Sequence, residues 1–180
     1  MLILALVALG VGVVGGQPGT DGRGPDGAAV LEREVVPLLG ELDALWTGGR
    51  DGGPAIATAL RDLRSGVGAP EEGTLLLWEQ AHETLLVRMV GIDLTAEARA
   101  VQRQAVLVVA LSRDAVGALA RAASLGPGAA RDEQLAQAVR LRLRAEEAGL
   151  AVTASIDDLR GDRQRLMTPS RLPDLAELVG

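Results

Sequence analysis

The sequence predicts an all-α protein, an antiparallel helical bundle of about five helices with a long C-terminal helical hairpin, preceded by a hydrophobic N-terminal segment. Three observations support this fold class. Apolar residues recur at helical spacing through most of residues 28–167, Gly- and Pro-rich breaks divide that stretch, and no strand pattern appears beyond residues 2–14. With 180 residues, of which 48% are hydrophobic and 23% charged, the chain can bury a core of ordinary size.

The N-terminal segment, residues 2–16, contains no charged side chain. As a helix it would be about 23 Å long, shorter than the roughly 30 Å hydrocarbon core of a bilayer. We therefore predict a signal peptide or short membrane anchor over residues 1–16, and a location at the cell membrane or outside the cytoplasm. The alternative is a buried strand or helix of a cytoplasmic protein. Residues 17–27 are a Gly/Pro-rich linker by composition, and residues 28–180 form the predicted bundle domain.

Two helices are expected in the first third of this domain. The first covers residues 28–46, and Pro37 should kink or restart it. Its apolar face consists of Leu31, Val35, Leu38, Leu42 and Leu45. The Gly-rich residues 47–53 separate it from a shorter helix that begins at Pro54 and ends within residues 66–70. The apolar face of that helix consists of Ile56, Leu60, Leu63 and Val67.

The third and fourth predicted helices carry clearer apolar faces. Pro70, Glu71 and Glu72 begin the third, with acidic side chains at the positive end of the helix dipole. Its seam is Leu75, Trp78, His82, Leu85, Met89 and Ile92. Thr95 or Asp93 should cap the fourth helix, residues 96–124, whose seam is Ala98, Val101, Ala105, Val108, Ser112, Ala115, Leu119 and Ala122. Seven consecutive apolar residues, 105–111, indicate that more than one face of this central helix is covered.

The last predicted helix covers residues 129–167 and completes the hairpin. Its seam is mostly apolar, includes small residues that would allow close helix approach, and also contains two arginines; the residues are Leu135, Ala138, Arg142, Ala145, Gly149, Val152, Ile156, Leu159, Arg163 and Leu166. Its far end should extend past its partners within the chain, so we expect a weak homodimer there, with Ile156, Leu159 and Leu166 as the interaction residues. In the alternative, residues 172–179 fold back and cover that end within one chain.

The composition excludes several kinds of chemistry. The chain has no Cys, so disulfides and thiolate sites are ruled out, and no Lys, so a Walker-type phosphate loop is ruled out. A net charge of −6 argues against nucleic-acid binding, which needs a basic surface. Gly10, Gly12 and Gly15 imitate a dinucleotide fingerprint, but no helix start follows them. We therefore expect no cofactor.

The single histidine, His82, has two conceivable functional roles, metal ligand and catalytic base. Glu79 and His82 have the spacing of half a di-iron carboxylate site, which needs a second such pair that the sequence lacks. His82 also falls in the apolar seam next to Trp78, so we predict a structural role and no metal site. No serine lies in a nucleophile elbow, and Ser112 and Ser155 are expected to bond back to their own helices. The sequence therefore predicts no catalytic residues.

These observations together favour a non-enzymatic helical bundle, exported or membrane-tethered, that binds a protein partner or itself. The partner is not identified by any motif, and membrane contact is expected only through residues 2–16. The alternative function is a sensory or carrier bundle that holds a small apolar ligand between helices, beside Trp78 and Met89. An enclosed pocket would favour the carrier, whereas a filled seam with an exposed apolar strip would favour protein interaction.

Overall fold

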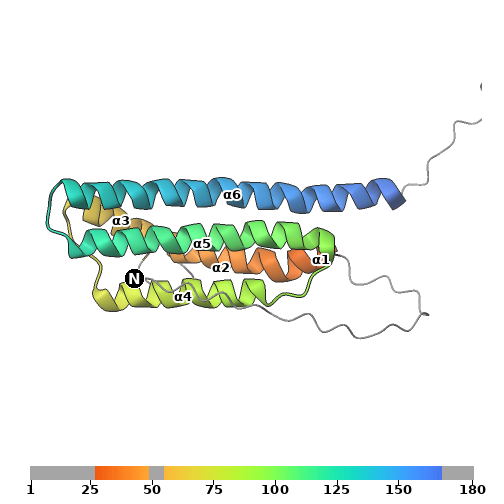
Figure 1. The fold of residues 1–180 in the computed structure, drawn as a ribbon, viewed down its shortest axis with the longest axis horizontal. Helices are drawn as coiled ribbons and strands as arrows, with labels where there is room; N and C mark the ends of the chain where they lie inside the picture. Colours follow the sequence, from red (N-terminus) through yellow and green to blue (C-terminus); the bar gives the residue numbers. More distant parts are fainter. Residues whose placement is uncertain (1–26, 49–54, 168–180) are drawn as a thin grey trace, which may run out of the picture.

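The helices of the chain lie alongside one another in a computed structural model that describes residues 27–48 and 55–167. The N-terminal helical stretch comprises α1 (Gly27–Val30), η1 (Leu31–Val35) and α2 (Val36–Thr47). It is followed by α3 (Ile56–Ser65), α4 (Glu72–Val90), α5 (Ala96–Ser124) and α6 (Ala129–Met167). No strand occurs in these described ranges, and the five packed helices, counting α1–η1–α2 as one, confirm the predicted all-α bundle (Figure 1).

The first helix accommodates Pro37 through a π-helical turn. The backbone N–H of Val36 donates to the carbonyl of Leu31, five residues earlier, and η1 occupies the turn between them. Proline lacks an N–H and its ring crowds the carbonyl four residues before it, so a widened turn at this place relieves both problems. The expected kink is therefore a local widening, and α1, η1 and α2 run on as one helical stretch.

The ends of α3 are set by backbone signals. Gly66 adopts a left-handed φ of 74°, and the N–H of Val67 donates to the Asp62 carbonyl at 2.9 Å, which closes the helix. Ile56 and Leu63 are buried as expected. Val67 is 77% exposed, because it lies beyond this cap and no longer follows the helical period.

The side chain of Gln102 bridges the junction between α4 and α5. The amide of Gln102 donates to the carbonyls of Met89 and Ile92, at 2.8 and 2.9 Å, and so satisfies groups at the end of α4. Thr95 precedes α5 as expected, although its hydroxyl makes no capping bond. These contacts fix α4 and α5 as antiparallel neighbours, with the end of α4 beside the start of α5.

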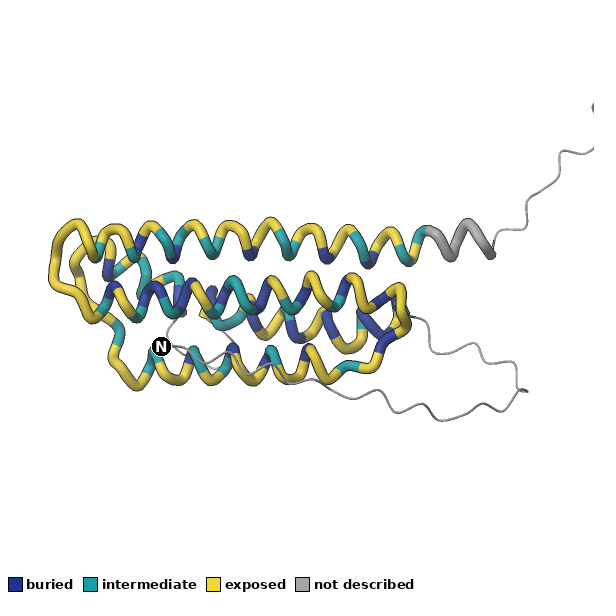
Figure 2. The backbone as a smooth tube through the Cα atoms, in the orientation of Figure 1, coloured by how far each residue is buried: buried dark blue, intermediate teal, exposed yellow. Residues whose placement is uncertain are grey.

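The central element is α5, which contacts every other helix of the bundle, most extensively α6 and then α4. All eight seam residues expected on it are buried. Figure 2 shows the buried positions of α6 on the side that faces α5, so these two helices form the long hairpin predicted. One core cluster, around Leu31, Met89 and Val109, includes the far part of α6, and a second lies around Trp46, Ile56 and Leu119.

The far end of α6 packs within the chain. Ile156 is buried and Leu159 is half-buried, both against the cluster that includes Leu31. Arg160 pairs with Glu32 of η1. A partner molecule is therefore not needed to cover these two residues; the side chain of Leu166, the segment 172–179 and the N-terminal segment lie outside the described residues. Among the helices of residues 27–48 and 55–167, none contains an apolar stretch of the length that a transmembrane span requires.

Candidate functional site

A buried polar network joins three helices at the centre of the bundle. His82 of α4 and Ser112 of α5 are fully buried, and Trp46 at the end of α2 is 3% exposed. The indole N–H of Trp46 donates to Ser112 Oγ at 2.6 Å, and Ser112 Oγ lies 2.9 Å from His82 Nε2. His82 Nδ1 lies 2.6 Å from the carbonyl oxygen of Trp78.

These partners define which nitrogen of His82 carries the proton. A carbonyl oxygen can only accept, so Nδ1 donates to Trp78. Nε2 is then the acceptor, and the Ser112 hydroxyl donates to it while its oxygen accepts from Trp46. Every polar group of the network has a partner, which is the condition for burying such groups without a large cost in stability.

The environment of His82 favours the neutral ring. Burial lowers its pKa below the ordinary 6.5, against the opposing effect of the hydrogen bond to Trp78. Arg113 and Glu83, the charged groups nearby, act in opposite directions. His82 is therefore a neutral structural residue at neutral pH, in the apolar seam where the sequence placed it.

The partners of His82 leave neither ring nitrogen free for a metal ion in this structure. Both ring nitrogens of His82 are occupied by Trp78 and Ser112, while Glu79 lies in a surface hollow. Nowhere in the part of the chain that the structure covers do three His, Cys, Asp or Glu side chains gather as metal ligands. Ser112 bonds to other helices, so the expectation of a bond to its own backbone was wrong. Ser155 makes that bond, to the Ala151 carbonyl at 2.9 Å.

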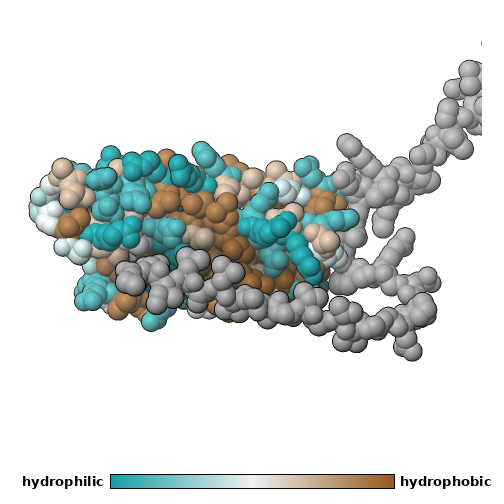
Figure 3. All heavy atoms as spheres, viewed as in Figure 1, coloured by the Kyte–Doolittle hydropathy of each residue, from teal (hydrophilic) through white to brown (hydrophobic). Residues whose placement is uncertain are grey.

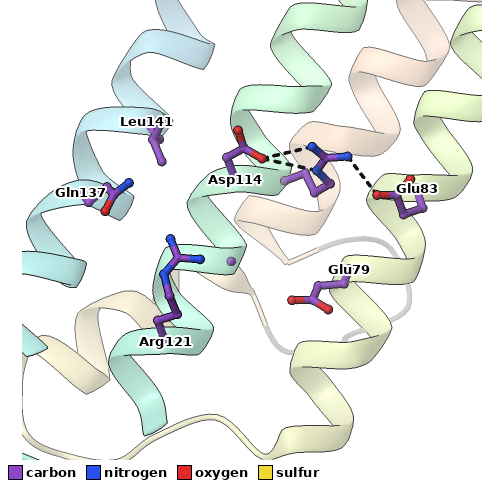
Figure 4. A pocket seen from close by; sticks show the side chains of 8 residues that line it. Glu79, Glu83, Asp114, Arg121, Gln137 and Leu141 are labelled. Carbon is purple, nitrogen blue, oxygen red and sulfur yellow. Dashed lines mark hydrogen bonds and ion pairs between the residues drawn. The ribbon is translucent and has the colours of Figure 1, made fainter. Parts of the chain in front are cut away.

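One face of the bundle, where α5 lies between α4 and α6, carries a charged hollow of about 370 Å³ (Figure 4). Its lining is Glu79, Glu83, Arg113, Asp114, Gly117, Arg121, Gln137 and Leu141. Arg113 pairs with Glu83 at 3.0 Å and with Asp114 at 3.2 Å. Burial opposes the charge of Arg113, but these hydrogen bonds outweigh it and raise the pKa of the guanidinium. Glu79 has no ion-pair partner among the described residues. Gly117 contributes no side chain to the lining of the hollow.

The same face becomes apolar toward the start of α5. On each helix, positions three, four or seven residues along from the hollow continue the same ridge. The positions on these ridges include six apolar residues, which together we call the apolar patch: Leu86 and Val90 on α4, Val106, Leu107 and Ala110 on α5, and Ala148 on α6. Val90 is 65% exposed and Leu107 is 51% exposed. Figure 3 shows hydrophobic atoms gathered across the middle of this face, between polar groups.

Sequence reasoning missed this surface for a physical reason. The run 105–111 predicted that more than one face of the central helix is covered, and Ala105, Val108 and Val109 are indeed buried. Leu107 points to the remaining face, which α4 and α6 border without covering. Exposed leucines also occur on the outer ridge of α6, at Leu143 and Leu150, away from the patch.

Comparison with known proteins adds no assignment to this geometry. Neither a family model, nor a curated protein, nor a solved structure matches the chain.

Proposed function

We propose that this chain is a non-enzymatic docking protein, exported or membrane-tethered through residues 2–16, which binds a protein partner or a second copy through the apolar patch. The observation that carries the proposal is the exposure of Leu107 and Val90 on a face whose underlying seam is filled. Contiguous apolar surface of this kind is typical of interaction sites.

The tether is tested by separating membranes from the soluble fraction in cells that make a tagged full-length chain. The proposal expects either membrane recovery with residues 2–16 present or an extracytoplasmic chain that lacks them. Recovery wholly in the cytosol with residues 2–16 intact contradicts it.

The docking surface is tested with Leu107→Arg in the full-length chain. The chain is cross-linked in membranes, and the products are then purified in mild detergent. The matched control is Leu150→Arg, since Leu150 is 73% exposed on α6 and lies outside the patch. A cross-linked species that is lost in Leu107→Arg and kept in Leu150→Arg supports the proposal. The same cross-linked species in both variants contradicts it.

A small-ligand carrier is the second candidate, favoured by one observation. A hollow of about 460 Å³ between α3 and α4 reaches Trp78, with Ala59, Val67 and Pro70 in its lining. It opens to the surface and is also bordered by Asp62 and Glu71, which fits an apolar ligand less well than an enclosed cavity does. Titration with a brominated fatty acid tests it: quenching of tryptophan fluorescence supports a carrier, and unchanged fluorescence contradicts it.

A further inference from the structure

The apolar patch and the N-terminal segment have complementary chemistry. In the patch, Val90 and Leu107 are exposed to solvent and Leu86 is half-buried, and residues 2–16 contain no charged side chain that would need a counter-charge. We propose that residues 2–16 dock on the apolar patch of their own chain when they are not in a membrane. This inference rests on the proposed function in one respect, that the patch is a docking surface.

The connection is long enough for this contact. The described chain begins at Gly27, where an added Cβ would lie 2.7 Å from Thr95 Oγ1 and 3.1 Å from the Cβ of Ala98. Gly27 is therefore beside the first turn of α5. Leu107 is nine residues further along α5 than Ala98, a distance of about 14 Å at the helical rise. Residues 17–26 span at most about 35 Å when extended, so they can pass around the start of α5 to the patch.

The length of the N-terminal segment is also similar to that of the apolar stretch on α5. A helix of the length of residues 2–16 would measure about 23 Å. On α5 the apolar stretch lies between Arg103 and Asp114, which are about 17 Å apart along the axis. The segment therefore covers the patch without extending far onto the charged groups at either end.

Charge favours the same path for the linker. Arg99 and Arg103 stand on the ridge that leads from the start of α5 to Leu107, since each is four residues from the next. Arg103 has no ion-pair partner among the described residues, and Arg99 donates only to the Leu94 carbonyl. The linker carries Asp21 and Asp26 against one basic residue, Arg23, so its net charge of −1 is opposite in sign to these guanidinium groups, which it would pass on the way to the patch.

A second copy fits the patch less well. A stable protein interface buries about 800 Å² on each partner, which would extend past the apolar residues onto Arg103 at one end and Glu83 and Asp114 at the other. The tethered segment, in contrast, is held near the patch at an effective concentration of the order of millimolar. It therefore outcompetes a dilute second copy.

The test uses the absence of cysteine from the full chain. One cysteine replaces Leu9, at the middle of the segment, and a second replaces Leu107. The control pair is Leu9→Cys with Leu150→Cys, in which the second position is an exposed leucine on the outer ridge of α6. Both double variants are oxidised at high dilution without detergent. Mass spectrometry confirms that residues 2–16 are present, and circular dichroism confirms equal helicity.

We expect the intrachain disulfide to form about tenfold more in the 9–107 pair than in the 9–150 pair, as the effective concentration of a docked segment requires. Equal yields, or disulfides chiefly between chains, overturn the inference. The two proposals fail separately. If the 9–107 disulfide is absent while Leu107→Arg still removes the cross-linked partner, the patch is a docking surface for another molecule. If the disulfide forms and Leu107→Arg changes no partner, the patch serves only this segment.

Discussion

The guanidinium carbon of Arg142 lies 4.6 Å from the centre of the Trp46 ring. Its Nε also pairs with Glu146 at 2.9 Å, and one terminal nitrogen lies 3.6 Å from an Asp43 oxygen. The side chain is 19% exposed, so the arginine in the seam of α6 covers the edge of the second core cluster. The presence of Arg142 in a mostly apolar row is explained by this stacking.

Replacing Arg142 with methionine should lower the free energy of unfolding by about 1 kcal/mol, because the stacking on Trp46 is lost while much of the apolar stem is kept. Urea denaturation monitored by circular dichroism measures the change. The control is Arg140→Met, an exposed arginine of the same helix, which should change stability by less than about 0.5 kcal/mol. Equal losses in the two variants would show that the Trp46 contact is not the cause.

Ser112→Ala should lower the free energy of unfolding more than Ser155→Ala does. It leaves the indole N–H of Trp46 without an acceptor and Nε2 of His82 without a donor, both in the core, which costs about 2–3 kcal/mol. Ser155→Ala removes surface bonds to Ala151 and Gln104 and should cost less than about 0.5 kcal/mol. Urea midpoints compare the two, and a difference smaller than the experimental error would contradict the network.

Acid should destabilise the fold through His82. Its pKa is lowered in the folded chain, so below the ordinary value of 6.5 the unfolded chain binds a proton that the native chain does not. Unfolding is therefore favoured as pH falls through that value, by up to about 1.4 kcal/mol per pH unit, until the lowered pKa is reached. Well above pH 6.5 the histidine is neutral in both states, so it makes the free energy of unfolding no more dependent on pH.

The measurement is the free energy of unfolding at several pH values for the native sequence and for His82→Leu. The variant should lose the dependence just below pH 6.5, whatever its overall stability. Because the chain has one histidine, its imidazole resonance can also be followed directly by NMR. A titration at or above the ordinary value would refute the neutral buried state.

Alanine substitution should have different effects on stability at two glycines, Gly149 and Gly27. An added Cβ at Gly149, inside α6, meets no atom within 4 Å, so Gly149→Ala should stabilise the fold by about 0.5–1 kcal/mol. At Gly27 the new Cβ would lie 2.7 Å from Thr95 Oγ1, so the gain in helix propensity should be cancelled or reversed. Thermal melting of both variants tests this, and an equal increase in Tm would count against close packing at Gly27.

The bounds and buried faces of the long helices could be predicted closely from sequence. The side chains that their buried residues contact on other helices could not. The period of residues 96–124 identified all eight buried seam positions because each depends only on its own helix. The bonds of Ser112 join residues 66 and 30 positions away, and no helical period specifies which distant side chain lies opposite. The apolar patch was missed for a related reason: periodicity identifies the face that is buried but not a gap between two bordering helices.

The π turn at Leu31–Val35 has a consequence for how the start of the chain is oriented. A widened turn is equivalent to one inserted residue, which rotates everything before it by about 100° relative to a regular helix. With that rotation Ala28 and Val30 are buried and Glu32 meets Arg160. Deleting Glu34 would restore regular winding in the turn before Pro37 but rotate Ala28 and Val30 away from their contacts. The one extra residue thus acts as a phase shift that brings two successive segments of one helix into register with different neighbours.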